Sequence, residues 1–136
     1  MPPSIRSEEL ERHEPPVKDS PRILVVDDSQ EILTMLSHAL SRHGFVIDAA
    51  TSTEEALARL ATETYDAAVV DLVMPGQDGA ALAAALRERI QGLPVALMTA
   101  YARSPLLVAA RKAGARVFPK PLSIQDLVAF LRSEIP

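Results

Sequence analysis

The sequence predicts an α/β fold, in which a parallel sheet of five strands is covered by helices on both faces. Short, almost wholly apolar runs recur along the 136-residue chain, as expected of strands that are buried on both sides. Each run is followed by a segment with apolar residues at helical spacing, and this pair repeats along the chain. The predicted strands cover residues 23–26, 45–49, 67–70, 94–98 and 116–118.

Residues that favour helix ends mark where the predicted helices begin and stop. Ser52 and Glu55 stand at the spacing of a capping box, and Pro105 occupies a first helical position, where proline is favoured. Gly44 and Gly114 follow helical segments, as expected of C-terminal caps. The predicted helices begin at Ser29, Ser52, Asp78, Ser104 and Ser123.

Composition excludes several classes of protein. The chain has no cysteine, which rules out disulfides, thiol catalysis and thiolate metal sites. The formal net charge is −4 and only 4% of residues are aromatic, so direct nucleic-acid binding is not expected. The sequence contains neither an apolar run long enough to span a membrane nor a secretory signal pattern. We therefore expect a cytoplasmic protein without membrane association.

The first part of the chain differs from the rest. Residues 1–21 contain five prolines with mixed charges between them and are predicted to form an N-terminal extension or linker. Residues 22–136 are predicted to form the folded domain.

Polar side chains stand where the predicted strands end. Asp27 and Asp28 follow the first strand, Asp71 the third, Thr99 the fourth and Lys120 the fifth. In an open parallel sheet these ends share one edge, where ligands bind. Three carboxylates in one crevice repel each other, and Mg²⁺ with oxygen ligands relieves that repulsion. One aspartate can then attack phosphorus as a nucleophile, while the metal, lysine and threonine stabilise the phosphoryl oxygens.

Four segments at these strand ends resemble the receiver domains of two-component response regulators, the family of the chemotaxis response regulator. They are Ile-Leu-Val-Val-Asp-Asp-Ser at 23–29, Asp-Leu-Val-Met-Pro-Gly-Gln-Asp-Gly at 71–79, Met-Thr-Ala-Tyr at 98–101 and Pro-Lys-Pro-Leu at 119–122. The resemblance covers about residues 22–134. It implies a flavodoxin-like (βα)5 three-layer sandwich with strand order 2-1-3-4-5.

The resemblance also implies roles for individual residues at the carboxylate cluster. Asp71 is the expected phosphoacceptor. Asp27, Asp28, Asp71 and the backbone carbonyl of Val73 are the expected Mg²⁺ ligands. Thr99 is the expected switch hydroxyl.

Further expectations concern the surroundings of that cluster. Lys120 is expected to contact the phosphoryl group, aimed by a cis bond to Pro121. The side chains of Val73 and Tyr101 are expected to modulate self-dephosphorylation. Because Val73 cannot orient a water molecule and Tyr101 is placed to block its approach, a phosphoryl form lasting minutes or more is expected.

The predicted fifth strand departs from the family pattern. The family carries an aromatic switch residue three positions before the lysine, where this chain has Val117, and Phe118 comes one residue later. The stretch from Gly114 to Lys120 is also one residue short. Either Phe118 takes the aromatic role through a shift in register, or the aromatic rotation is missing. The second interpretation is preferred.

The resemblance implies a signalling switch rather than a turnover enzyme. The expected phosphodonor is a sensor histidine kinase or a histidine phosphotransfer protein. The expected output is a protein target, or self-association, through the fourth helix, fifth strand and fifth helix.

Two alternatives stay open. A receiver-like module that is never phosphorylated is favoured only by the altered fifth strand. A haloacid-dehalogenase-type phosphatase would need a second aspartate where Val73 stands.

Overall fold

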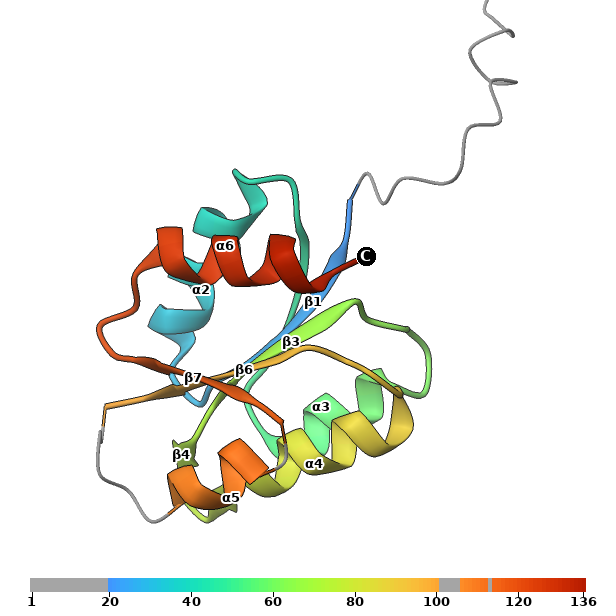
Figure 1. The fold of residues 1–136 in the computed structure, drawn as a ribbon, viewed down its shortest axis with the longest axis vertical. Coiled ribbons are helices and arrows are strands. Elements are labelled where there is room, and N and C mark those ends of the chain that lie inside the picture. The colour runs from blue at the N-terminus through green and yellow to red at the C-terminus, as the bar shows by residue number, and fades with distance from the viewer. Residues whose placement is uncertain (1–19, 101–105, 113) are drawn as a thin grey trace, which may run out of the picture.

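The computed structural model describes residues 20–100, 106–112 and 114–136. The elements of the main sheet alternate with helices along the chain (Figure 1). The strands are β1 (Arg22–Val26), β2 (Val46–Ala50), β3 (Ala67–Asp71), β6 (Val95–Thr99) and β7 (Arg116–Pro119). The helices are α2 (Gln30–Ser41), α3 (Thr53–Arg59), α4 (Gly79–Arg89), α5 (Leu106–Lys112) and α6 (Ile124–Glu134).

The strand order confirms the predicted topology. The strands of the main sheet run parallel in the order β2-β1-β3-β6-β7, which is the order 2-1-3-4-5 when only these strands are numbered. Helices α2 and α6 cover one face of the sheet, and α3, α4 and α5 cover the other (Figure 1). The result is the expected flavodoxin-like sandwich of three layers.

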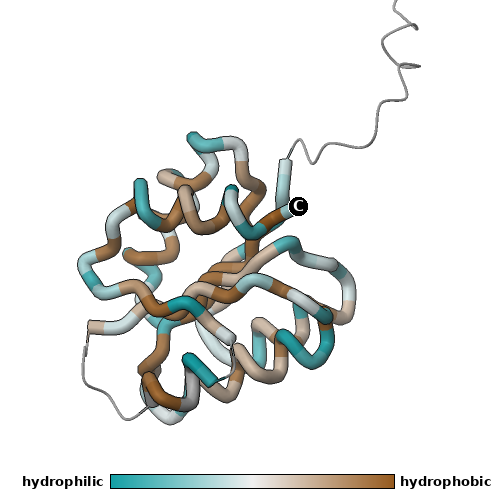
Figure 2. The backbone as a smooth tube through the Cα atoms, viewed as in Figure 1, coloured by the Kyte–Doolittle hydropathy of each residue, from teal (hydrophilic) through white to brown (hydrophobic). Residues whose placement is uncertain are grey.

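Each face of the sheet carries its own hydrophobic core, because successive side chains in a strand point to opposite faces. Leu24 and Val26 pack towards α3 and α4, whereas Ile23 and Val25 pack towards α2 and α6. Hydrophobic residues accordingly concentrate along the central strands in Figure 2. The central strands β1, β3 and β6 are therefore almost continuous apolar runs, and polar side chains lie at or just after their carboxyl ends.

The predicted caps are present at the helix starts that the structure describes. The side chains of Ser29, Ser52 and Ser123 each accept a hydrogen bond from the amide three residues later. Asp78 accepts from the amides of Ala80 and Ala81. Ser104 and Pro105 lie outside the described residues.

Two details differ from the sequence-based prediction. Strand β2 begins one residue later than expected, at Val46, because the Phe45 amide donates to the Leu40 carbonyl of α2, although the Phe45 side chain is buried. A short antiparallel hairpin, β4 (Val73–Met74) with β5 (Gln77–Asp78), stands between β3 and α4. Its two-residue strands are too short to give a periodic signal.

Within the described part of the chain, every helix is too short or too polar to cross a membrane.

Candidate metal centre

Three carboxylates meet at the carboxyl edge of the sheet, as the sequence predicts. One oxygen from each of Asp27, Asp28 and Asp71 lies within 4.8 Å of the other two. Asp27 and Asp71 are only 1% and 5% exposed, whereas Asp28 is open to solvent. Two of the three carboxylates in the cluster are therefore buried, and the cluster is accessible to solvent at Asp28.

Backbone hydrogen bonds hold Asp27 in place. Its amide donates to the Ala50 carbonyl at the end of β2, at 3.1 Å. One of its carboxylate oxygens, Oδ1, accepts from the Ser29 amide at 2.9 Å. The other oxygen faces the lysine described next, so the carboxylate has little freedom to rotate.

Lys120 reaches the cluster from the end of β7. Its ammonium lies 3.3 Å from Asp27 Oδ2 and 3.4 Å from Asp71 Oδ2. The backbone amide of Lys120 donates to the Thr99 carbonyl at 2.8 Å, which fixes the base of the side chain. The Lys120–Pro121 peptide bond is cis. One positive charge thus faces two buried negative charges.

The electrostatic balance at Asp71 favours a bound cation. Burial raises the pKa of the Asp71 carboxyl above its ordinary value, and the negative charge of Asp27 raises it further. The Lys120 ammonium and a hydrogen bond from the Val73 amide lower this pKa, but they do not cancel the increase. A hard divalent cation held by carboxylate oxygens supplies the missing charge, so the donor set fits Mg²⁺.

The loop after Asp71 is pinned closely to the start of α4. A Cβ on Gly79 would lie 2.1 Å from the carbonyl oxygen of Asp71, far inside contact distance. The Gly79 amide also donates to the Leu72 carbonyl at 3.0 Å. The sequence pattern alone did not predict this requirement at Gly79. Gly79 is the first residue of α4, where no turn requires glycine. That unexplained glycine is the sequence feature that could have indicated a close backbone contact.

Thr99 ends β6 beside the cluster and is buried. The alternation along β6 places it on the same face as Leu97, towards α4 and α5. Tyr101 lies outside the described residues.

The two candidate switch positions in β7 point to opposite faces. Val117 pairs with Leu97 and packs towards α4 and α5, on the Thr99 side. Phe118 pairs with Met98 and belongs to the core under α2 and α6. No aromatic side chain of β7 therefore stands on the face that carries Thr99.

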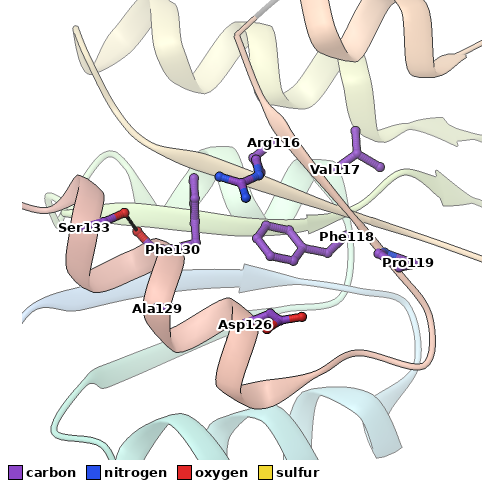
Figure 3. A pocket seen from close by; sticks show the side chains of 8 residues that line it. All are labelled: Arg116, Val117, Phe118, Pro119, Asp126, Ala129, Phe130 and Ser133. Carbon is purple, nitrogen blue, oxygen red and sulfur yellow. Dashed lines mark hydrogen bonds between the residues drawn. The ribbon is translucent and has the colours of Figure 1, made fainter.

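Phe118 is held on its own face by an aromatic cluster (Figure 3). Its ring meets that of Phe130 edge to face, with 5.4 Å between centroids. The guanidinium of Arg116 lies 5.8 Å from both ring centroids. These residues line a groove of about 470 Å³ between β7 and α6. A shift of Phe118 into the aromatic switch role would have to take the ring across the sheet. This geometry supports the interpretation that the aromatic rotation is missing.

The fold and this site match one family. The family model for the response regulator receiver domain matches residues 23–132. The chain belongs to that family and is a response-regulator receiver domain.

Known relatives agree. The response regulator MprA of Mycobacterium ulcerans is 36% identical over 115 residues, which cover 84% of this chain and 50% of the relative. The DNA-binding transcriptional regulator NtrC of Salmonella typhimurium is 37% identical over 114 residues, covering 83% of this chain and 24% of the relative. The chain thus spans about half the length of its MprA relatives.

Solved receiver domains superpose well. A CheY-like receiver domain from Methanospirillum hungatei gives a TM-score of 0.79 at 28% identity, covering 85% of this chain and 93% of the other. The response regulator TrrA of Thermotoga maritima, in complex with Mg²⁺ and BeF, gives a TM-score of 0.74 at 31% identity, covering 83% and 97%.

Proposed function

We propose that this receiver domain takes a phosphoryl group on Asp71 in a Mg²⁺-dependent reaction and signals through a protein-interaction surface. The proposal depends on one observation, the arrangement of charged side chains around Asp71. The buried Asp71 carboxylate shares an acidic cluster with Asp27 and Asp28 and meets the Lys120 ammonium.

The proposed reaction uses the chain's own groups as follows. A carboxylate oxygen of Asp71 attacks the phosphorus of a phosphohistidine. The new O–P bond forms as the P–N bond breaks, and the histidine leaves with its electron pair and takes up a proton. In this proposal the Lys120 ammonium stabilises the phosphoryl oxygens. The Thr99 hydroxyl donates a hydrogen bond to one of these oxygens and so links phosphorylation to a change in conformation.

Asp27, Asp28, Asp71 and the Val73 carbonyl are the proposed Mg²⁺ ligands. A cation held by these residues would supply positive charge to the transferring phosphoryl group. Asp71 would then keep its carboxyl ionised and nucleophilic, although burial raises its pKa.

An apolar hollow beside the cluster supports a protein phosphodonor. The hollow has a volume of about 460 Å³ and is lined by Ile32, Met35, Lys120, Pro121 and Leu122. Met35 is 45% exposed, so the hollow presents a large apolar side chain to solvent. Because Lys120 lies in its wall, a partner seated here holds its phosphohistidine near Asp71. A sensor histidine kinase or a histidine phosphotransfer protein fits this requirement.

The proposed output surface comprises α5, β7 and α6. Val108 on α5 is 59% exposed, and Arg111 and Lys112 are exposed in the last turn of the same helix. An apolar residue among cations suits a protein partner or a second copy of the chain better than bulk solvent. Val117 stands at the position where the family carries its aromatic switch residue. We therefore assign the conformational change after phosphorylation to movement of Thr99 and the neighbouring chain, rather than to rotation of an aromatic ring.

We assign the chain to signalling rather than to catalytic turnover, because Val73 has no acid–base group where a phosphatase of the dehalogenase type needs one. We also propose that residues 1–21 are an extension and 22–136 the domain, which the family match at 23–132 supports.

Intact mass spectrometry tests the chemistry. After incubation with acetyl phosphate, wild type should gain one phosphoryl mass with Mg²⁺ and none with a chelator. Asp71→Asn should gain none under either condition. A wild type that stays unmodified with Mg²⁺ would favour the receiver-like module that is never phosphorylated.

A further inference from the structure

A side-chain hydrogen bond joins the hairpin after Asp71 to a helix that the proposed mechanism does not use. The side-chain carbonyl of Gln77, in β5, accepts from the backbone amide of Thr53, the first residue of α3. The two residues are 24 positions apart in sequence. The first amides of a helix have no partner within the helix, so Gln77 also caps α3.

The start of α3 is itself fixed to the acidic cluster. Ser52 caps the helix through the Glu55 amide, and the Glu55 carboxylate accepts from both the amide and the hydroxyl of Thr51. Thr51 follows Ala50, whose carbonyl accepts from the Asp27 amide. A continuous series of hydrogen bonds and adjacent residues therefore connects the Asp27 loop to the start of α3. There the Thr53 amide donates its hydrogen bond to Gln77.

The other end of the path is the proposed metal ligand. Val73 pairs with Asp78, and Met74 pairs with Gln77 across the hairpin. Val73, Pro75, Gly76 and Asp78 are all exposed, so little side-chain burial holds the hairpin in place. Met74 is its buried residue. The hydrogen bond between Gln77 and the Thr53 amide therefore restricts the movement of β4, the strand that carries the Val73 carbonyl.

We propose that Gln77 is a positioning residue that, by binding the Thr53 amide, sets the Val73 carbonyl relative to Asp27 and Asp71 for Mg²⁺. This inference rests on the proposed function, because it assigns regulation of the same site. Gln77 does not touch the metal itself. It reduces the freedom of the hairpin before the cation binds, and a ligand that is already in place binds more tightly than one that must be ordered.

The chain offers a clean way to remove each half of the bond. Gln77→Leu removes the acceptor. Thr53→Pro removes the donor at the first helical position, where proline is favoured. Ser52 has φ −153° and ψ 163°, the extended conformation that a residue before proline prefers, so α3 should keep its start. Gln77→Glu keeps an acceptor oxygen.

A matched control exists on the opposite edge of the sheet. Gln91 is exposed in the turn between α4 and β6, so Gln91→Leu makes the same chemical change away from the acidic cluster. The readout is the Mg²⁺ dissociation constant, measured by isothermal titration calorimetry on the unphosphorylated protein. Urea denaturation of the same variants measures stability separately.

We expect Gln77→Leu and Thr53→Pro each to weaken Mg²⁺ binding by about three- to tenfold, as for loss of one hydrogen bond. The double variant should bind no more weakly than either single variant, since all three lack the same bond. Gln77→Glu and Gln91→Leu should bind at least as tightly as wild type. A purely structural role would lower the urea midpoint and leave the dissociation constant unchanged. That result, or a double variant whose effect is the product of the two single effects, overturns the proposal.

The proposed function can fail separately in the same experiment. If wild type binds no Mg²⁺, or if Asp71→Asn binds it as tightly as wild type, the metal centre itself is wrong and this inference falls with it. If wild type binds and depends on Asp71, while Gln77→Leu matches wild type, only the role of Gln77 is refuted.

Discussion

Replacing Lys120 with methionine should change stability and metal affinity in opposite directions. The ammonium lies 3.3 Å from Asp27 Oδ2 and 3.4 Å from Asp71 Oδ2. At an effective dielectric constant of about 20, each contact corresponds to about 5 kcal/mol of Coulomb attraction before the loss of hydration is subtracted. Removing one partner of a buried pair leaves the other charges uncompensated, so Lys120→Met should destabilise the metal-free protein by about 3 kcal/mol.

The same substitution should tighten Mg²⁺ binding. A cation held by these carboxylate oxygens would lie within about 5.5 Å of the ammonium, given Mg–O distances of about 2.1 Å. Repulsion between a unit charge and a divalent ion at that distance costs about 1.5 kcal/mol even at the dielectric constant of water. Relief of that repulsion corresponds to roughly tenfold tighter binding. Phosphorylation should nevertheless slow, because Lys120 no longer stabilises the phosphoryl oxygens.

Urea denaturation in a chelator and calorimetric titration of Mg²⁺ at low ionic strength measure the two effects. Lys112→Met is the matched control, since Lys112 is exposed near the end of α5 and should alter neither quantity appreciably. A metal-free Lys120→Met protein as stable as wild type, or one that binds Mg²⁺ more weakly, would refute the electrostatic account of the cluster.

Asp71→Asn should stabilise the metal-free protein at pH 7, because burial and the charge of Asp27 raise the pKa of the Asp71 carboxyl and its ionisation opposes folding. In urea titrations this gain should disappear as the pH falls below the ordinary aspartate pKa of about 4, and a gain that persists at pH 3 would contradict the cause given. Gly79→Ala should cost about 3 kcal/mol or more, since its Cβ would lie 2.1 Å from a backbone oxygen, and a loss below about 1 kcal/mol would show that α4 can move away freely. The phosphoryl form should last minutes or longer, because Val73 cannot orient an attacking water. Decay of the phosphorylated mass within a few seconds of removing acetyl phosphate would exclude this.

The main strands were predictable because burial on both faces leaves a direct trace in the sequence. The runs at 23–26, 67–70 and 94–98 fall within one residue of β1, β3 and β6 at each end. Convergence of the carboxylates followed from the same rule, since parallel strands bring their carboxyl ends to one edge. Side-chain caps such as Ser29 and Asp78 were predictable from local chemistry.

The features that escaped prediction depend on contacts between distant segments. The bond from Gln77 to the Thr53 amide joins a hairpin to a helix that neither local pattern connects. The close approach of Gly79 to the Asp71 carbonyl is set by how α4 meets β3. The face taken by Phe118 was left open by the sequence, because one residue fewer before Lys120 is compatible with either register. Pairing of Phe118 with Met98 and packing against Phe130 determine that face.

Locating the modified residue is the most direct test of the claim that Asp71 receives the phosphoryl group. Reductive trapping with borohydride converts a phosphorylated aspartate to homoserine, which tandem mass spectrometry of peptides can place in the sequence. After incubation with acetyl phosphate and Mg²⁺, we predict homoserine at position 71 and at no other aspartate. Homoserine at position 27 or 28, or unmodified peptide at 71 in protein that carries the added mass, would contradict the account.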